Sequence, residues 1–327
     1  MRGVVVSELR GPAAARLGEV EEPAGAHPLA DGVRLLVEVH AAGISFPDVL
    51  QTRGEYQFAT PPPFVAGGEV AGVVIEADPG SGFEPGDRVA GLTMWGAMAE
   101  RALAIPRFTL RLPDELDFVA GAALHLNYTT AWFAIDRAGV VAGEAVLVHG
   151  AAGGVGTAAL QLLAGVGARP IAVVSDAEKE AVARRMGAAE VLRSDGDWVA
   201  GARELTGGHG VAVVLDPVGG DRFTDSLRTL DVGGRLVVIG FAAGSIPTVK
   251  VNRLLLRNLT VTGIAYDPMD RRFPGTLARI NGAVAELAAA GRIEPLVGCR
   301  LPLERGPEAL ALIDRREAVG KVVVEVT

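Results

Sequence analysis

The stretch from Ala145 to Ala168 constrains the fold of this chain more than any other part of its sequence. A short apolar run is followed by a cluster of glycines and then by alanine, leucine and glutamine at helical spacing, which predicts a strand, a tight turn and a helix. The N-terminus of such a helix offers unpaired N–H groups and the positive end of its dipole to a phosphate. The spacing is AxGxxG over Ala151, Gly153 and Gly156, so alanine replaces the usual first glycine of a dinucleotide-binding turn.

Composition excludes several classes of function. The 327 residues, 49% of them apolar, suffice for one large domain or two ordinary ones. A net charge of −8 without a basic cluster argues against nucleic-acid binding. The single cysteine, Cys299, allows neither an internal disulfide nor a cysteine-based zinc site. No stretch resembles a signal peptide or a convincing membrane span, so we expect a cytoplasmic protein.

Periodicity divides the chain into two kinds of segment. Up to residue 110 it predicts short strands and turns, including strands at 3–8 and 33–40, with one short helix at 48–53 ended by Gly54. From Asp117 a helix runs to Gly139, after which apolar strands alternate with helices, as in a doubly wound parallel sheet. The tail from Arg271 departs from this rhythm, so we expect it to return to the β-rich domain.

Motifs along essentially the whole chain carry a family resemblance: AAGISFPDVLQTRGEY, GDRVAGL, VLVHGAAGGVGTAALQL, VLDPVGG, GGRLVVIGFAAGSIP and NRLLLRNLTVTG. Together, and in this order, they resemble the zinc-free medium-chain dehydrogenase/reductase superfamily, and within it the NADPH:quinone oxidoreductases. The resemblance implies an α/β protein with a β-rich GroES-like catalytic (substrate) domain, residues 1–120 and 266–327. Residues 121–265 would form a Rossmann NADPH-binding domain, with the active site in the cleft between the two. It also implies a homodimer formed through the last Rossmann strand, residues 259–265.

The resemblance also bears on metal binding. Zinc-dependent relatives carry a cysteine and a histidine at the positions occupied here by Ser45 and Gly68. Asp48 and Glu69 remain, but two carboxylates without nitrogen or sulfur ligands make a poor zinc site. They could equally serve turn and strand hydrogen bonds. We expect no metal.

Cofactor choice depends on the residue that ends the second Rossmann strand. That position falls on Val174, so the acid that binds the ribose of NAD is missing. Ser175 and Lys179 match the family's phosphate-binding pair, and Arg193 could compensate for a tyrosine that this chain lacks. Asp176 counts against NADPH unless it serves the first turn of the following helix. The sequence therefore predicts NADPH.

The resemblance implies further cofactor-binding residues in three places. These are the helix before the glycine turn, the turn itself and the loop after GGRLVVI: Asn127, Thr130, Ala152, Gly153, Gly154, Val155, Gly240, Phe241 and Ala242. Thr130 has an equally good alternative, a hydrogen bond to the backbone of its own helix.

Without zinc, hydrogen-bond donors must polarise the carbonyl, and NADPH must supply the hydride. Tyr56 lies where related enoyl reductases carry a tyrosine that supports protonation, although a packed structural tyrosine is an equal alternative. Ser45 is the second candidate. We therefore expect an NADPH-dependent oxidoreductase acting on a small-molecule quinone or a conjugated enone or alkenal.

Three alternatives remain open at this point. Reduction of an enoyl thioester such as an acyl-CoA would need a basic entrance, for which Arg53, Arg271 and Arg272 are available. The chain could instead be a non-catalytic NADPH-binding partner protein, or a zinc alcohol dehydrogenase. The residues do not identify the natural acceptor.

Overall fold

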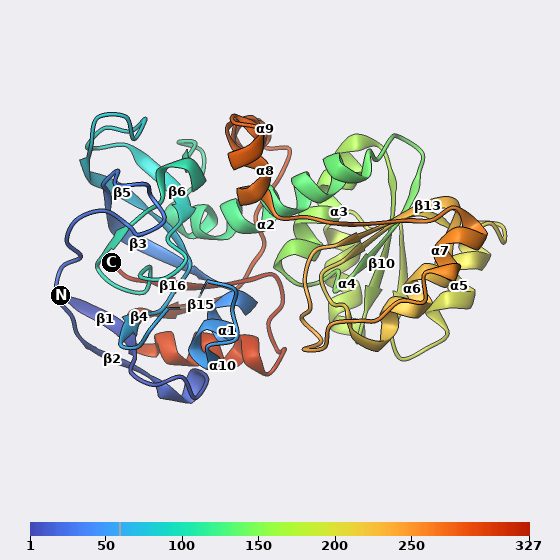
Figure 1. Cartoon of the computed structure of the whole chain (residues 1–327), viewed down its shortest axis with the longest axis horizontal. Coiled ribbons are helices and arrows are strands. Elements are labelled where there is room, and N and C mark those ends of the chain that lie inside the picture. Colours follow the sequence, from blue (N-terminus) through green and yellow to red (C-terminus); the bar gives the residue numbers. More distant parts are fainter. Residues whose placement is uncertain (59) are drawn as a thin grey trace. The chain divides into compact units, whose positions relative to one another are not determined.

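The computed structural model describes residues 1–58 and 60–327, which form two compact units (Figure 1). The first unit contains Met1–Thr129 and Gly275–Thr327, and the second contains Thr130–Pro274. The predicted boundary between residues 120 and 121 falls inside helix α2 (Phe118–Ala138). Composition gives no signal for a boundary within one continuous helix.

The first unit is built on two β-sheets. Three strands, in the order β2 (Ala15–Glu19), β1 (Arg2–Val6) and β4 (Phe64–Val65), form the smaller one. The larger sheet has the order β15 (Val297–Pro302), β16 (Lys321–Glu325), β3 (Leu35–Ile44), β5 (Glu69–Ala77), β6 (Arg88–Leu92) and β8 (Thr109–Arg111), with β7 (Arg101–Leu103) also paired to β3. The C-terminal strand β16 is antiparallel to β3, which confirms the predicted return of the tail to this domain (Figure 1).

Helix α1 (Phe46–Arg53) follows β3 directly and is placed by its own sequence. Pro47 lies in its first turn, where a missing N–H costs nothing. Gly54 ends it with a φ of 69°, the left-handed conformation that glycine adopts without strain. The same unit contains α9 (Thr276–Ala289) and α10 (Gly306–Asp314). The sequence predicts helices at 48–53, 275–290 and around 307–315, which match these three with ends that differ by one or two residues.

The second unit has a parallel sheet with the strand order β11 (Glu190–Arg193), β10 (Arg169–Val174), β9 (Ala145–His149), β12 (Val211–Asp216), β13 (Leu230–Val238) and β14 (Thr260–Gly263). Its helices are α3 (Gly154–Val166), α4 (Ala177–Arg185), α5 (Trp198–Leu205) and α6 (Phe223–Thr229). Along the chain, β10 and β11 extend the sheet outward from β9, and β13 and β14 extend it in the opposite direction from β12. This order confirms the predicted doubly wound sheet and places a topological switch point beside the glycine turn.

The elements without a specific prediction include β2, α7 (Asn252–Arg257) and α8 (Tyr266–Arg272). Strand β2 is largely exposed, and the two helices bury no residue, so none of the three has the apolar periodicity that a prediction requires. Within the described ranges, no helix combines the length and the apolar character that crossing a membrane would need.

Candidate active site and cofactor site

The glycine turn is tightly packed between β9 and α3. Gly153 precedes α3 and provides no side chain to cap it, so the first N–H groups of the helix have no partner within the helix. A Cβ atom on Gly156 would lie 2.3 Å from the carbonyl oxygen of Gly150 and 2.6 Å from Cα of Ala151. Both are backbone atoms, so Gly156 is required for this turn. The alanine at position 151 is buried and causes no break in it.

A group of polar side chains lies at the end of β10. Parallel pairing places Arg193 opposite Val174, the last residue of that strand. A guanidinium nitrogen of Arg193 donates to the carbonyl oxygen of Ser175 at 2.7 Å, and Lys179 Nζ donates to Ser175 Oγ at 3.0 Å. The structure therefore brings together the three residues that the sequence assigned to a 2′-phosphate.

Asp176 lies within the same group. One carboxylate oxygen accepts the backbone N–H of Lys179 at 2.8 Å, which caps α4, and the other accepts the Ser175 hydroxyl at 2.8 Å. These hydrogen bonds, that of the Lys179 backbone first, lower the pKa of Asp176 to about 2. Asp176 is therefore a helix cap, as one of the two sequence-based interpretations had it. It also lies 3.1 Å from Lys179 Nζ and would repel a phosphate there.

Asp216, which the sequence analysis did not single out, ends the central strand β12. Its Oδ1 accepts the N–H groups of Val218 at 2.9 Å and Gly219 at 2.8 Å. Its Oδ2 is buried and has no hydrogen-bond partner among the described residues, and burial raises the pKa of the carboxyl group. An unpartnered acceptor at the carboxyl end of a central strand fits a ribose hydroxyl. The signal in the sequence was an acid directly after an apolar strand.

The loop after β13 is fixed against this turn. Its backbone N–H groups at Gly240 and Ala242 donate to the carbonyl oxygens of Asp216 at 3.4 Å and Pro217 at 3.1 Å. Two of the loop's predicted ligand groups, these amides, therefore already have backbone partners, whereas the side chain of Phe241 is exposed.

Asn127 and Thr130 both lie on α2, but Asn127 belongs to the first unit and Thr130 to the second. Asn127 is buried, and its Nδ2 donates to the carbonyl oxygen of Ala123 in its own helix at 3.3 Å. Contact of either residue with the nicotinamide remains a prediction.

The predicted catalytic residue Ser45 belongs to a buried charged cluster in the first unit. Lys321 Nζ donates to Ser45 Oγ at 2.6 Å and to a carboxylate oxygen of Glu69. The side chains of Lys321 and Glu69 are only 2% and 1% exposed. The strand register explains why Lys321 and Glu69 lie close together. Strand β3 pairs with both β5 and β16, and its Gly43 lies opposite Glu69 and Val323. The second carboxylate oxygen of Glu69 accepts the backbone N–H of Leu126 at 2.9 Å.

Asp48 links this cluster to Tyr56, the other predicted catalytic residue. Its carboxylate accepts the backbone N–H of Ser45 at 2.7 Å, and burial raises its pKa to about 6. Burial, and secondly the charge of Asp48, raises the pKa of Tyr56. Asp48 therefore hydrogen-bonds to one predicted catalytic residue, Ser45, and acts electrostatically on the other, Tyr56. Lys321 was missed by the sequence analysis, although a lysine that begins the apolar run VVVEV was a signal.

The position that carries histidine in zinc-dependent relatives has little room for a side chain. A Cβ atom on Gly68 would lie 3.1 Å from Oδ1 of Asp48 and 3.3 Å from the carbonyl oxygen of Met94. Within residues 1–58 and 60–327, no three side chains of the His, Cys, Asp or Glu type are grouped so that they could hold a metal ion.

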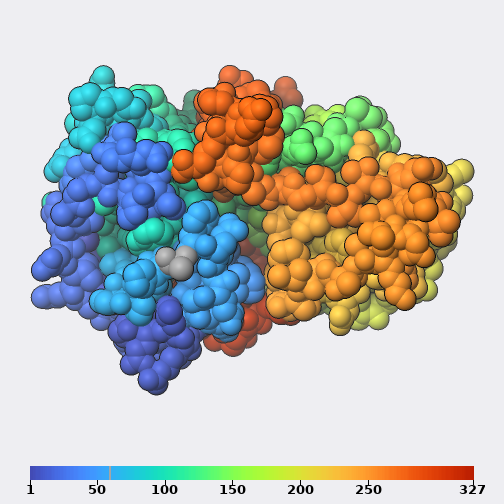
Figure 2. Space-filling view, viewed as in Figure 1, coloured from blue at the N-terminus to red at the C-terminus, as the bar shows by residue number. Residues whose placement is uncertain are grey.

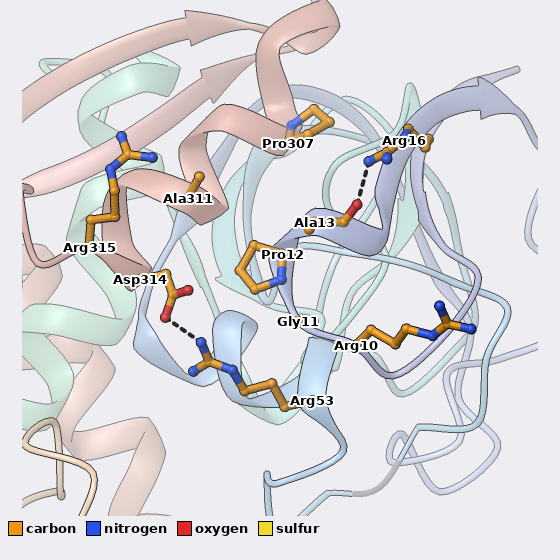
Figure 3. A pocket seen from close by; sticks show the side chains of 10 residues that line it. All are labelled: Arg10, Gly11, Pro12, Ala13, Arg16, Arg53, Pro307, Ala311, Asp314 and Arg315. Atoms are coloured by element: carbon orange, nitrogen blue, oxygen red, sulfur yellow. Dashed lines mark hydrogen bonds and ion pairs between the residues drawn. The ribbon is translucent and has the colours of Figure 1, made fainter.

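An arginine-lined pocket of about 380 Å³ surrounds Arg53 in the first unit (Figure 3). Its lining residues are Arg10, Gly11, Pro12, Ala13, Arg16, Arg53, Pro307, Ala311, Asp314 and Arg315. Figure 3 shows Arg53 turned towards Asp314, with which it forms an ion pair at 2.6 Å. Arg10 and Arg315 also pair with acids, Glu8 and Glu317. Most of the positive charge is therefore neutralised, which does not favour the basic entrance that a thioester substrate needs.

Comparison with known proteins agrees with this geometry. The model of the alcohol dehydrogenase GroES-like domain matches residues 31–114, and that of the zinc-binding dehydrogenases matches residues 154–281. The chain is 37% identical to quinone oxidoreductase-like protein 2 of Rattus norvegicus, over 88% of this chain and 83% of the relative.

Two solved structures have the same fold along their whole length. A probable oxidoreductase from Mycobacterium abscessus is 40% identical, with a TM-score of 0.89 over 100% of this chain and 99% of that one. The quinone oxidoreductase of Thermus thermophilus, described with its NADPH complex, is 33% identical, with a TM-score of 0.83 over 100% of both chains. The protein therefore belongs to the quinone oxidoreductase family of the medium-chain dehydrogenases/reductases and is an oxidoreductase.

Proposed function

We propose that this protein is an NADPH-dependent oxidoreductase that transfers a hydride to a quinone or to a conjugated enone or alkenal, without a metal ion. The observation that carries the proposal is the group of Ser175, Lys179 and Arg193 around the end of β10, where no acid takes the position that binds NAD. The NADPH complex of the Thermus thermophilus relative supports it.

The residues of the second unit fit this cofactor, which would supply the hydride when bound. The glycine turn would hold the pyrophosphate through the N–H groups of Gly154 and Val155, with Ala152 and Gly153 shaping the turn. Ser175, Lys179 and Arg193 would bind the 2′-phosphate. The unpartnered oxygen of Asp216 would accept a ribose hydroxyl. We assign the nicotinamide end to Asn127, Thr130 and the loop from Gly240 to Ala242.

Substitutions of two residues at the 2′-phosphate site are expected to change KM for NADPH in opposite directions. Lys179→Ala is expected to raise KM for NADPH by roughly tenfold to a hundredfold, the value of one hydrogen bond to a charged group. Asp176→Asn is expected to lower the same KM, because asparagine still caps α4 while the repelling charge is removed. Steady-state kinetics with NADPH and NADH measure both, and KM for NADH should hardly change. Equal effects on the two cofactors would refute the assignment.

In the first unit, Ser45 and Tyr56 are the proposed donors to the substrate's carbonyl oxygen. Ser45, Asp48 and Glu69 offer only oxygen atoms, and Lys321 places an ammonium group among them, so this cluster is unsuited to zinc. Elemental analysis of the active protein is expected to find no stoichiometric zinc.

Tyr56→Phe tests the role of the tyrosine. We expect kcat with conjugated enones to fall by about a hundredfold, the value of a positioned proton donor, while NADPH affinity stays unchanged. Turnover of quinones should survive, because a quinone oxygen can take its proton from water. Unchanged kcat with enones would assign protonation to water or Ser45.

The alternative of a non-catalytic NADPH-binding protein is tested by the same assay. It predicts tight NADPH binding without oxidation by any quinone or enone in a panel. The enoyl-thioester alternative stays second, because the arginines around Arg53 are largely paired with acids.

We further propose a homodimer formed through β14. This strand lies at the edge of its sheet, where backbone groups remain available for pairing with another chain. The preceding helix α7 exposes Leu255 and Leu256, 77% and 76% accessible, and residues 250–265, coloured orange, lie at the surface in Figure 2. Light scattering should give twice the mass of the chain.

A cytoplasmic location belongs to the same proposal. Cys299 is a free thiol, which fits a reducing compartment, and fractionation of cells that express the protein tests the location.

A further inference from the structure

The buried ammonium group of Lys321 calls for an explanation beyond folding. Lysine is almost never fully buried unless it is paired, and well-packed apolar residues are often as good as a buried ion pair, or better, for stability. Lys321 is nevertheless 2% exposed and begins a strand whose next three residues are buried valines. The ion pair with Glu69 accounts for the charge but not for the choice of a lysine here.

The surrounding residues are arranged to hold the Lys321 side chain in one place. A Cβ atom on Gly43 would lie 2.6 Å from Cε of Lys321 and 2.0 Å from the carbonyl oxygen of Ala122, so the lysine occupies space that only glycine leaves. Glu69, which binds Nζ, is itself fixed by the N–H of Leu126. Nζ therefore has a defined position, set by the strands of one sheet and the helix α2.

The hydrogen bond from this fixed group determines what Ser45 can do. Because Ser45 Oγ accepts from Lys321 Nζ, the hydroxyl proton of Ser45 cannot point at the ammonium and is left for another acceptor. The backbone N–H of Ser45 is held by Asp48, so the residue cannot easily rotate away. Ser45 is only partly buried, whereas Lys321, Glu69 and Asp48 are buried, so Ser45 is the member of the cluster that a ligand can reach.

We propose that Lys321 is a positioning residue that orients and polarises Ser45 as the hydrogen-bond donor to the carbonyl oxygen of the substrate. The inference rests on the proposed function and names a residue that the function by itself does not require. Hydride adds to the acceptor carbon, and an electron pair of the conjugated system moves onto the carbonyl oxygen. Ser45 donates its hydrogen bond to that oxygen, and Lys321 keeps its protons while donating to Ser45 Oγ. The proton that completes the reduction comes from Tyr56 or from water.

The charges around Lys321 suit this role. The ammonium donates a hydrogen bond to the carboxylate of Glu69, and the buried carboxyl group of Asp48 also interacts with it electrostatically. A cation behind Ser45 makes its hydroxyl a stronger donor, since low-dielectric surroundings strengthen electrostatic interactions. The effect should be largest when negative charge develops on the carbonyl oxygen, that is, in the transition state.

A double-mutant cycle between Lys321 and Ser45 tests the proposal. Every variant with Lys321→Met also carries Glu69→Gln, so that both charges of the buried pair are removed together and neither is left unpaired in the core. Ser45→Ala by itself is expected to lower kcat with an enone by about a hundredfold. Lys321→Met should lower kcat about tenfold or more, and combining the two should cost no more than Ser45→Ala alone. KM for NADPH and equilibrium NADPH binding should not change in any of them.

Arg101→Met combined with Glu22→Gln is the matched control, because it also removes both charges of one ion pair. It removes one cation of the same unit, whose ion pair with Glu22 is 43% and 45% exposed, and it should leave kcat unchanged. Losses from Ser45→Ala and Lys321→Met that multiply would show that Lys321 acts independently of Ser45, and would overturn the proposal. So would a loss of NADPH binding on Lys321→Met. If the unmodified protein binds NADPH but reduces no acceptor, the proposed function fails, and the proposed role of Lys321 fails with it. That result is distinguishable from multiplicative losses, which can be seen only in an active enzyme.

Discussion

Lys321→Met in the otherwise unchanged protein is expected to lower the free energy of unfolding by about 3–5 kcal/mol, since it leaves Glu69 buried and without its cation. Adding Glu69→Gln should restore most of this loss, because neither side chain of the former pair is then charged and the backbone N–H of Leu126 still has an acceptor. Urea unfolding at neutral pH measures the free energy of unfolding of both variants. Trp95, which lies in the same unit, reports the unfolding by its fluorescence once the other two tryptophans are replaced by phenylalanine.

A partly exposed ion pair in the same unit supplies the comparison. Arg53→Met breaks the pair with Asp314, whose side chains are 33% and 30% exposed, and should cost at most about 1 kcal/mol. If Lys321→Met costs no more than Arg53→Met, or if Glu69→Gln makes the loss larger, the description of a desolvated, mutually dependent pair is wrong.

Gly156→Ala is expected to abolish useful NADPH binding. The added Cβ atom would lie 2.3 Å from one backbone atom and 2.6 Å from another, and neither can move without opening the turn before α3. Loss of two hydrogen bonds to the phosphates would weaken binding by roughly a hundredfold or more. Strain in the turn should lower the stability of the second unit by about 1–3 kcal/mol. Titration of NADPH fluorescence and thermal unfolding measure the two effects.

The same helix provides a control for this substitution. Gly165 also lies in α3, but a Cβ atom there would meet no atom within 4 Å. Gly165→Ala should leave NADPH binding unchanged and stabilise the unit by about 0.5–1 kcal/mol, because alanine favours a helix more than glycine does. Equal losses of NADPH affinity at positions 156 and 165 would mean that helix propensity, and not the close contact, explains the result.

Much of the fold could be predicted from the sequence because the decisive signals are local. The glycine cluster marks the turn before α3, the apolar runs mark the parallel strands, and Gly54 marks the end of α1. The return of the C-terminal tail to the first sheet followed from its break with the strand–helix rhythm. Strand β2 and helices α7 and α8 lie at the surface with few buried side chains, so their sequences carry too little periodicity to be identified.

The candidate site was predictable only where its parts are close in the sequence or match a known pattern. Ser175 and Lys179 lie four residues apart at the start of α4, one before the helix and one in its first turn, and the structure shows them in contact. Lys321 lies 276 residues from Ser45, and nothing local in either segment indicates that β16 pairs with β3 in the register that joins them. Asp216 was missed for a similar reason, because its unpartnered oxygen is a consequence of burial and not of residue type.

The most direct test of the central claim is NADPH oxidation by the purified, metal-analysed protein with a panel of quinones and conjugated enones, compared with NADH. We predict acceptor-dependent turnover without stoichiometric zinc, and a kcat/KM at least about tenfold higher for NADPH, the value of one charge-assisted contact to the 2′-phosphate. Tight NADPH binding without turnover of any acceptor, or equal use of NADH, would contradict this account.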